Sequence, residues 1–195
     1  MRNHFSTILA AVAFTAISGA MLRAIPSDGG QTPQTSPRTT RITRGAYLVR
    51  AMGCNHCHTP YKLGPQGPEP DMARALTGHP SDVALPPAPP ASGPWVWHGA
   101  ATNTAFAGPW GVSFSANLTP DPETGLGRWT EDMFIATMRT GRHQGKGRPI
   151  LPPMPYENLA ALDDEDIRSL FAYLQSLAPV RNRVPGPVDP PEETR

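Results

Sequence analysis

The stretch "AMGCNHCHTP", residues 51–60, contains both cysteines of the 195-residue chain, Cys54 and Cys57, and a histidine, His58, directly after the second. A disulfide between these two cysteines would close a very small loop, so it would restrict the unfolded chain little and stabilise the fold little. A purely structural role therefore explains the pair poorly. The motif instead indicates a site that binds a metal or cofactor, or that takes part in redox chemistry.

Four kinds of site use closely spaced cysteines. A zinc ribbon needs a second ligand pair, but the chain has no third cysteine and its other histidines are scattered. A thioredoxin-like redox pair needs a βαβ context, whereas the motif is flanked by a helical pattern and a segment rich in proline and glycine. An exposed pair of free thiols would oxidise in an exported protein, and the N-terminus described below predicts export. The fourth kind, covalent haem attachment, has C-x-x-C-H as its signature.

The spacing suits haem chemistry. Two thiols on a tight turn can reach the two vinyl groups of one porphyrin, and the next side chain then lies under the iron, where an imidazole nitrogen can bind it. We therefore predict one haem c, covalently attached through Cys54 and Cys57, with His58 as an axial ligand.

A second axial ligand is predicted in "GRPILPPMPY", where three prolines surround Met154. Proline fixes the backbone and removes amide hydrogens, so this segment should be a stiff, non-helical strap. A thioether is a weak ligand and needs such a rigid support. We predict that Met154 and His58 are the metal ligands. His143, in the loop "GRHQGKGR", remains the alternative to Met154.

The N-terminus, "MRNHFSTILAAVAFTAISGAMLRA", has the form of a secretory signal peptide. Its apolar run is short for a membrane span, which needs about 20 residues. We predict a signal peptide or N-terminal anchor at 1–24, a linker at 25–41, and a periplasmic location, with membrane association through the N-terminus if it is retained. The net charge of +1 and the absence of a binding motif argue against nucleic acid as a partner.

Helical patterns predict three helices, at 44–54, 130–140 and 162–177. Thr130 and Asp163 are suited to cap the second and third, and both are followed by acidic residues. Apolar residues recur at helical spacing in the third, from Ile167 to Leu177. Gly45 has no side chain, so another helix could approach the first one closely there.

The order of these features resembles the class I c-type cytochromes: a helix leading into CNHCH, a proline-flanked Met154, and a last helix containing "LFAYLQSL". The segments "SANLTPDPETGLGRWTEDMFIATMRTG" and "ILPPMPY" are similar to the haem modules of alcohol and gluconate dehydrogenase cytochrome c subunits. Those subunits usually carry three haem motifs, whereas this chain carries one.

The resemblance implies an all-α fold, a cytochrome c-like helical haem domain with a long, Pro-rich irregular insertion. The domain is expected at 42–180, with the insertion at 60–116, and no segment shows convincing strand alternation. Residues 181–195 are polar and rich in proline, and are predicted to be a flexible tail.

The resemblance also implies which further residues surround the cofactor. It places Asn117, Leu118 and Pro120 against the haem, and it places Trp129 close to a propionate or in the core. It agrees with thioethers at Cys54 and Cys57 and with axial ligands at the positions predicted above.

The function expected on these grounds is that of a monohaem c-type cytochrome with no catalytic residues. It would carry single electrons between a periplasmic dehydrogenase or other donor and the respiratory chain, with a terminal oxidase or another cytochrome among its partners. The alternative is a haem enzyme whose sixth ligand is open or displaceable and which acts on peroxide or a small ligand.

Overall fold

The computed structural model describes residues 36–89 and 95–190. The predicted signal peptide or anchor, and most of the predicted linker, lie outside these residues. Within the described part of the chain, no helix is both long enough and apolar enough to cross a membrane.

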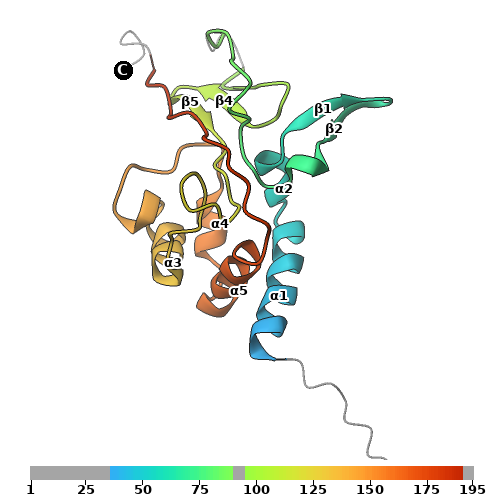
Figure 1. Ribbon diagram of the computed structural model, residues 1–195. Helices are drawn as coiled ribbons and strands as arrows, with labels where there is room; N and C mark the ends of the chain where they lie inside the picture. The colour runs from blue at the N-terminus through green and yellow to red at the C-terminus, as the bar shows by residue number, and fades with distance from the viewer. Residues whose placement is uncertain (1–35, 90–94, 191–195) are drawn as a thin grey trace, which may run out of the picture. The chain divides into compact units, whose positions relative to one another are not determined.

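The described residues contain five α-helices, two short 3₁₀ turns and five short strands (Figure 1). The helices are α1 (Pro37–Ala51), α2 (Cys54–His58), α3 (Glu131–Thr140), α4 (Tyr156–Ala160) and α5 (Asp164–Leu174). The strands are β1 (Tyr61–Gly64), β2 (Gly67–Pro70), β3 (His98–Gly99), β4 (Ala105–Gly108) and β5 (Gly111–Phe114). The 3₁₀ turns are η1 (Met72–Arg74) and η2 (His143–Gly145).

Helix α1 begins earlier than predicted, inside the range assigned to the linker. The Ser36 side chain accepts a hydrogen bond from the Thr39 amide at 3.2 Å, and Pro37 occupies the first turn. A serine cap followed by proline is a strong helix start. The serine side chain accepts a hydrogen bond from a first-turn amide that would otherwise be unpaired, and proline has no amide hydrogen that needs a partner. Residues 37–41, which were predicted to be part of the linker, are therefore helical.

Helix α5 begins where the sequence predicts. Asp163 caps it by accepting a hydrogen bond from the Asp166 amide at 2.7 Å, and three acidic residues occupy its first turn. Its inner face is buried, with Ile167, Leu170 and Leu174 each at most 2% exposed. This face packs against α1 and α3 and forms the centre of the hydrophobic core.

The close approach expected at Gly45 is confirmed. A Cβ built on Gly45 would lie 1.9 Å from the Ser169 carbonyl oxygen of α5. The two helices can be this close only because glycine has no side chain. On the other side of α5, the rings of Phe134 and Phe171 have their centroids 5.2 Å apart, which joins α3 to the same core.

The all-α prediction is wrong, because two antiparallel sheets occupy the segment predicted to be an irregular insertion. Strands β1 and β2 form a hairpin, and β3, β4 and β5 form a three-stranded sheet in that order. Each strand has only two to four residues, and in β1 and β2 half of the residues are exposed. Strands this short show too few residues for a two-residue hydrophobic period to stand out.

The segment predicted to be a flexible tail also differs from expectation over its described part. Asn182 is 9% exposed, and Val188 forms an antiparallel bridge with Val112. The sequence suggested a loose end because residues 181–190 are polar and rich in proline. Proline also stiffens a chain, and here the segment is held by the body of the domain.

Ion pairs on the helix surfaces give an acid-dependent stability. Hydrogen bonds from Arg44 and Arg139 lower the pKa of the Asp166 and Asp164 carboxyl groups below their usual value. A lowered folded-state pKa stabilises the fold above the unfolded pKa and loses that contribution as the pH falls through the folded one. We expect the urea concentration at the unfolding midpoint to fall as the pH goes from about 5 to about 2, because these carboxylates become protonated and lose their pairing with arginine. Unfolding curves of the wild type and of the double variant Asp164→Asn and Asp166→Asn check this: the variant should lose less stability on acidification, and an equal loss would show that these pairs contribute nothing.

Candidate cofactor site

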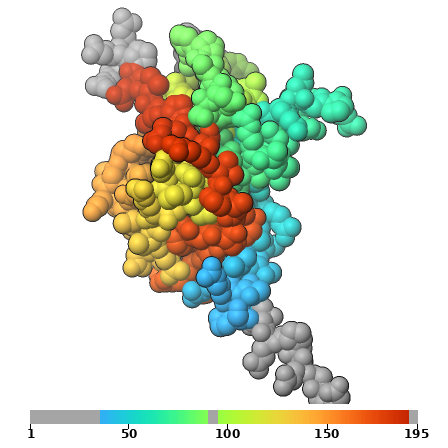
Figure 2. Space-filling view, viewed as in Figure 1, coloured from blue at the N-terminus to red at the C-terminus, as the bar shows by residue number. Residues whose placement is uncertain are grey.

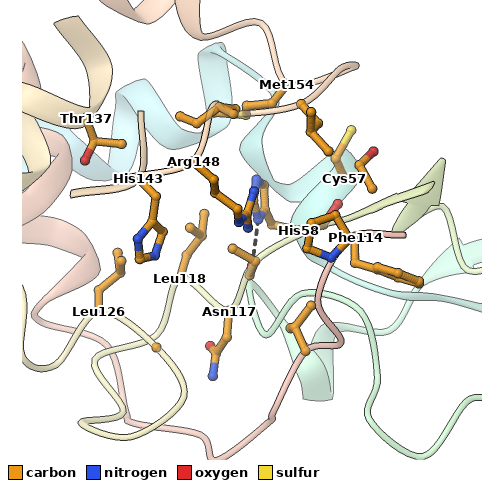
Figure 3. Close-up of a pocket in the computed structure, with 18 of the residues that line it drawn as sticks. Cys57, His58, Phe114, Asn117, Leu118, Leu126, Thr137, His143, Arg148 and Met154 are labelled. Carbon is orange, nitrogen blue, oxygen red and sulfur yellow. Dashed lines mark hydrogen bonds between the residues drawn. The ribbon is translucent and has the colours of Figure 1, made fainter. Parts of the chain in front are cut away.

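The described residues enclose a cavity of about 410 Å³, within the ~300–1,000 Å³ of small-molecule and cofactor sites. Its walls come from α2, from β4 and β5, from the loop before α3, from the segment before α4 and from the chain after α5. Figure 3 shows how side chains from these separate segments surround it. Most of the lining is apolar, with a few polar and sulfur-containing groups among it.

The cysteine motif forms the short helix α2 at one end of the cavity. Gly53 precedes it in a left-handed conformation (φ 70°), which turns the chain from α1 into α2. Both thiols are free, and Cys57 lines the cavity. Cys54 is not among the lining residues and packs against the hydrophobic core. Burial raises the pKa of the Cys54 thiol to about 11 and also raises that of Cys57.

His58 is held in one orientation at the cavity wall. It is 8% exposed, and its Nδ1 lies 2.8 Å from the backbone oxygen of Ala116. A carbonyl can only accept, so Nδ1 carries the proton and Nε2 keeps its lone pair. Burial lowers the pKa of the ring, which also favours the neutral form. A neutral imidazole oriented through its other nitrogen is the usual form of a histidine metal ligand.

Met154 lines the same cavity from the predicted strap. The backbone turns at Pro152 and Pro153 before reaching Met154, and α4 starts only at Tyr156, so the strap is not helical. Ser113 of β5 donates a hydrogen bond to the Pro152 oxygen at 2.6 Å, which ties the strap to the sheet. The structure thus places Met154 and His58 around one cavity, although they come from distant parts of the chain.

His143, the alternative to Met154, also lines the cavity. Its ring stands edge-on to Trp129, with centroids 5.1 Å apart and planes at 86°. Burial, and then the nearby charge of Arg148, lower the pKa of His143. Trp129 itself is among the lining residues, and both candidates for the second ligand line the same cavity.

The three residues predicted from "ANLTPD" have different positions. Leu118 lines the cavity, whereas Pro120 is not among the lining residues. Asn117 reaches the wall, but its side chain is used in hydrogen bonds: Nδ2 donates to the Val180 oxygen at 2.8 Å, and Oδ1 accepts from the Thr119 amide at 3.0 Å. The contacts of Asn117 thus fasten the chain that follows α5.

Several lining residues were not predicted from the sequence. They come from β4 and β5 (Phe106, Ser113 and Phe114), from α3 (Thr137) and from residues 183–187. No local signal marks them, because each reaches the cavity through strand pairing or through a long-range contact.

These residues fit a haem c. A thiol and a neutral imidazole lie in the wall, a thioether lines the same space, and the remaining lining is largely apolar. Imidazole with thioether or a second imidazole is a familiar axial pair for haem iron, and an apolar lining suits a flat, largely apolar macrocycle. No cluster of three or more acidic, histidine or cysteine side chains that could bind a bare metal ion occurs in the described ranges.

Several curated proteins similar to the chain are cytochrome subunits of dehydrogenases. Over 147 residues, 74% of the chain, it is 31% identical to the alcohol dehydrogenase (quinone), cytochrome c subunit, of Gluconobacter oxydans, and it covers 23% of that protein. Over 140 residues, 71% of the chain, it is 31% identical to the gluconate 2-dehydrogenase cytochrome c subunit of Pantoea cypripedii, and it covers 24% of it. Over 171 residues, 86% of the chain, it is 29% identical to the fructose dehydrogenase cytochrome subunit of Gluconobacter japonicus, and it covers 28% of it.

The chain therefore spans about a quarter of the length of these three relatives. No protein-family model matches it. The similarities confirm the predicted resemblance to dehydrogenase cytochrome c subunits.

Proposed function

Because this chain is a c-type cytochrome that resembles the cytochrome c subunits of alcohol and gluconate dehydrogenases, we propose that it carries single electrons from a periplasmic dehydrogenase to the next respiratory carrier. It does so with one covalently attached haem c. The next carrier is a terminal oxidase or another cytochrome. Its N-terminal leader exports it, or anchors it to the membrane on the periplasmic side.

Named residues would hold the haem. Cys54 and Cys57 would form the thioethers, and Nε2 of His58 and the thioether of Met154 would bind the iron. When bound, haem supplies an iron that cycles between the ferrous and ferric states. Leu118, Trp129 and the phenylalanines of the sheet exclude water, so little solvent has to reorganise when charge changes.

The observation that carries this proposal is the orientation of His58. Its hydrogen bond to the Ala116 oxygen, at 2.8 Å, leaves Nε2 as the free nitrogen of a ring in the wall of a cavity that Cys57 and Met154 also line. A packed core histidine would use both nitrogens, as His79 does with Thr104 and Val83. A single attached haem is supported by the two cysteines of the chain, which form one motif.

Covalent attachment can be tested directly. The wild type, expressed with a c-type maturation system, should retain its pigment after acid–acetone extraction and should contain about one haem per chain in a pyridine haemochrome assay, as a single C-x-x-C-H motif implies. The double variant Cys54→Ala and Cys57→Ala should retain none. His56→Ala is the matched control, since His56 lies between the two cysteines and is exposed, and it should keep its pigment.

A wild type without thioether-linked pigment would end this proposal. The donor is tested separately, by adding alcohol, gluconate or fructose to membranes that contain the oxidised protein. Substrate-dependent appearance of the reduced spectrum supports a dehydrogenase donor. Reduction by none of these substrates, in membranes shown to oxidise them with an artificial acceptor, would contradict a donor of the relatives' kind.

A further inference from the structure

The chain after α5 returns across the cofactor cavity. Residues 183–187 are part of the cavity lining. Figure 1 shows this segment, in red, leaving α5 and running to β5, and Figure 2 shows it on the surface beside the yellow loop that precedes α3. We refer to residues 182–188 as the C-terminal strap.

One end of the strap is anchored by Asn182. Its side-chain Nδ2 donates to the backbone oxygens of Thr77, at 2.7 Å, and His79, at 2.9 Å, and its Oδ1 accepts from the Ser81 amide at 2.9 Å. Its own amide donates to Oγ1 of Thr124 at 3.0 Å. Asn182 is 9% exposed, so these bonds are shielded from water and the group would be costly to leave unpaired.

Val180, two residues before the strap, is fastened as well. The Val180 amide donates to Oγ1 of Thr119 at 3.1 Å, and the Val180 oxygen accepts from Nδ2 of Asn117 at 2.8 Å. The loop "ANLTPD" thus holds this end of the strap with its polar side chains, while Leu118 of the same loop lines the cavity.

The other end is anchored to β5. The amide and oxygen of Val188 exchange hydrogen bonds with those of Val112, at 2.9 and 2.8 Å. Gly111 allows this approach, because a Cβ there would lie 2.0 Å from the Val188 oxygen.

Between the anchors, residues 183–187 make no hydrogen bonds within the part of the chain that the structure describes, and they lie over the cavity. Pro185 and Pro187 restrict the backbone, which reduces the entropy that the strap would gain on release. The strap is thus held at both ends, is stiff between them and lines the cofactor cavity. These are the features expected of a segment that covers the site.

We propose that the C-terminal strap is a fixed part of the cofactor site, which keeps water and external ligands away from the haem, and that Asn182 is its positioning residue. This inference rests on the proposed function. Solvent access and local dielectric tune the reduction potential of a metal site, so release of the strap should lower the potential by stabilising the more highly charged ferric state.

Two pairs of variants of the full-length, haem-loaded protein test this. Val188→Pro removes the amide that donates to Val112, and Val188→Ala is its control, because it keeps the amide and Val188 is 54% exposed. Asn182→Ala removes the other anchor, and Asn158→Ala is its control, since Asn158 is exposed on α4. If Asn182→Ala fails to fold, the proline pair still decides the question.

Two measurements are compared within each pair. Trypsin should cleave after Arg183 about 5-fold faster in Val188→Pro than in Val188→Ala, the change in opening expected from one hydrogen bond, and ~10-fold or more faster in Asn182→Ala. Imidazole should bind the ferric protein faster by similar factors, and the reduction potential should fall. The controls should match the wild type.

Equal cleavage within both pairs would show that the anchors do not hold the strap. Faster cleavage with unchanged imidazole binding and potential would show that the strap is held but covers nothing. Either result overturns the inference while a pigmented wild type leaves the proposed function intact. A wild type without covalent haem would instead mark failure of the proposed function.

Discussion

The variant Met154→Ala is expected to lose the long-wavelength sulfur-to-iron charge-transfer band of the oxidised protein. Methionine ligation raises the potential of a haem, so the reduction potential should also fall, by roughly a hundred millivolts or more within the ~0.8 V that axial ligands span. The sixth position would then be open, and carbon monoxide should bind the reduced variant at neutral pH. Absorption spectra and a redox titration measure all three effects.

His143→Ala is the control for this prediction, because His143 lines the same cavity and is the other candidate ligand. It should retain the charge-transfer band and should not bind carbon monoxide. Survival of the band in Met154→Ala would exclude Met154 as a ligand. If instead the wild type lacks the charge-transfer band, and His143→Ala binds carbon monoxide, then His143 is the second ligand.

Gly45→Val is expected to destabilise the fold by about 3 kcal/mol or more, at the upper end of the cost of overpacking a core. The added Cβ would lie 1.9 Å from the Ser169 oxygen and 2.7 Å from the Tyr173 Cβ, so α1 and α5 would have to separate. The obstacle is backbone, which cannot rotate away as a side chain can. Urea unfolding followed by circular dichroism measures the loss, and the yield of haem-loaded protein should fall with it.

Gly186→Ala is the matched control, since nothing lies within 4 Å of a Cβ built there. Its stability should stay within about 0.5 kcal/mol of the wild type, as is usual for an unhindered surface substitution. A Gly45→Val protein as stable as this control would mean that α1 and α5 can pack at a larger distance without loss.

The helices were predictable because their signals lie within a few residues. The cap at Asp163, the acidic first turn and the apolar spacing from Ile167 onward all occur inside α5. The start of α1 was misplaced because the cap at Ser36 lies in a polar segment that reads equally well as linker. A local signal was present there, but the apolar pattern that supports it starts later.

The cofactor motif was equally local. Cys54, Cys57 and His58 form one short helix, and the chemistry of their spacing follows from the covalent chain. The prolines around Met154 favour it as the second ligand, but the sequence leaves His143 open as the alternative. The structure brings both to the cavity, so spectroscopy has to separate them.

The amino-acid sequence therefore specified three of the five helices, the haem motif and the close approach that Gly45 permits. Folding alone specified the two small sheets, the roles of Asn117 and Asn182, and the strap that crosses the cavity. The physical reason is the separation of the partners. A helix cap joins residues three apart, whereas the bond from Asn182 to the Thr77 oxygen joins residues 105 apart, and such a pairing leaves no local pattern in either segment.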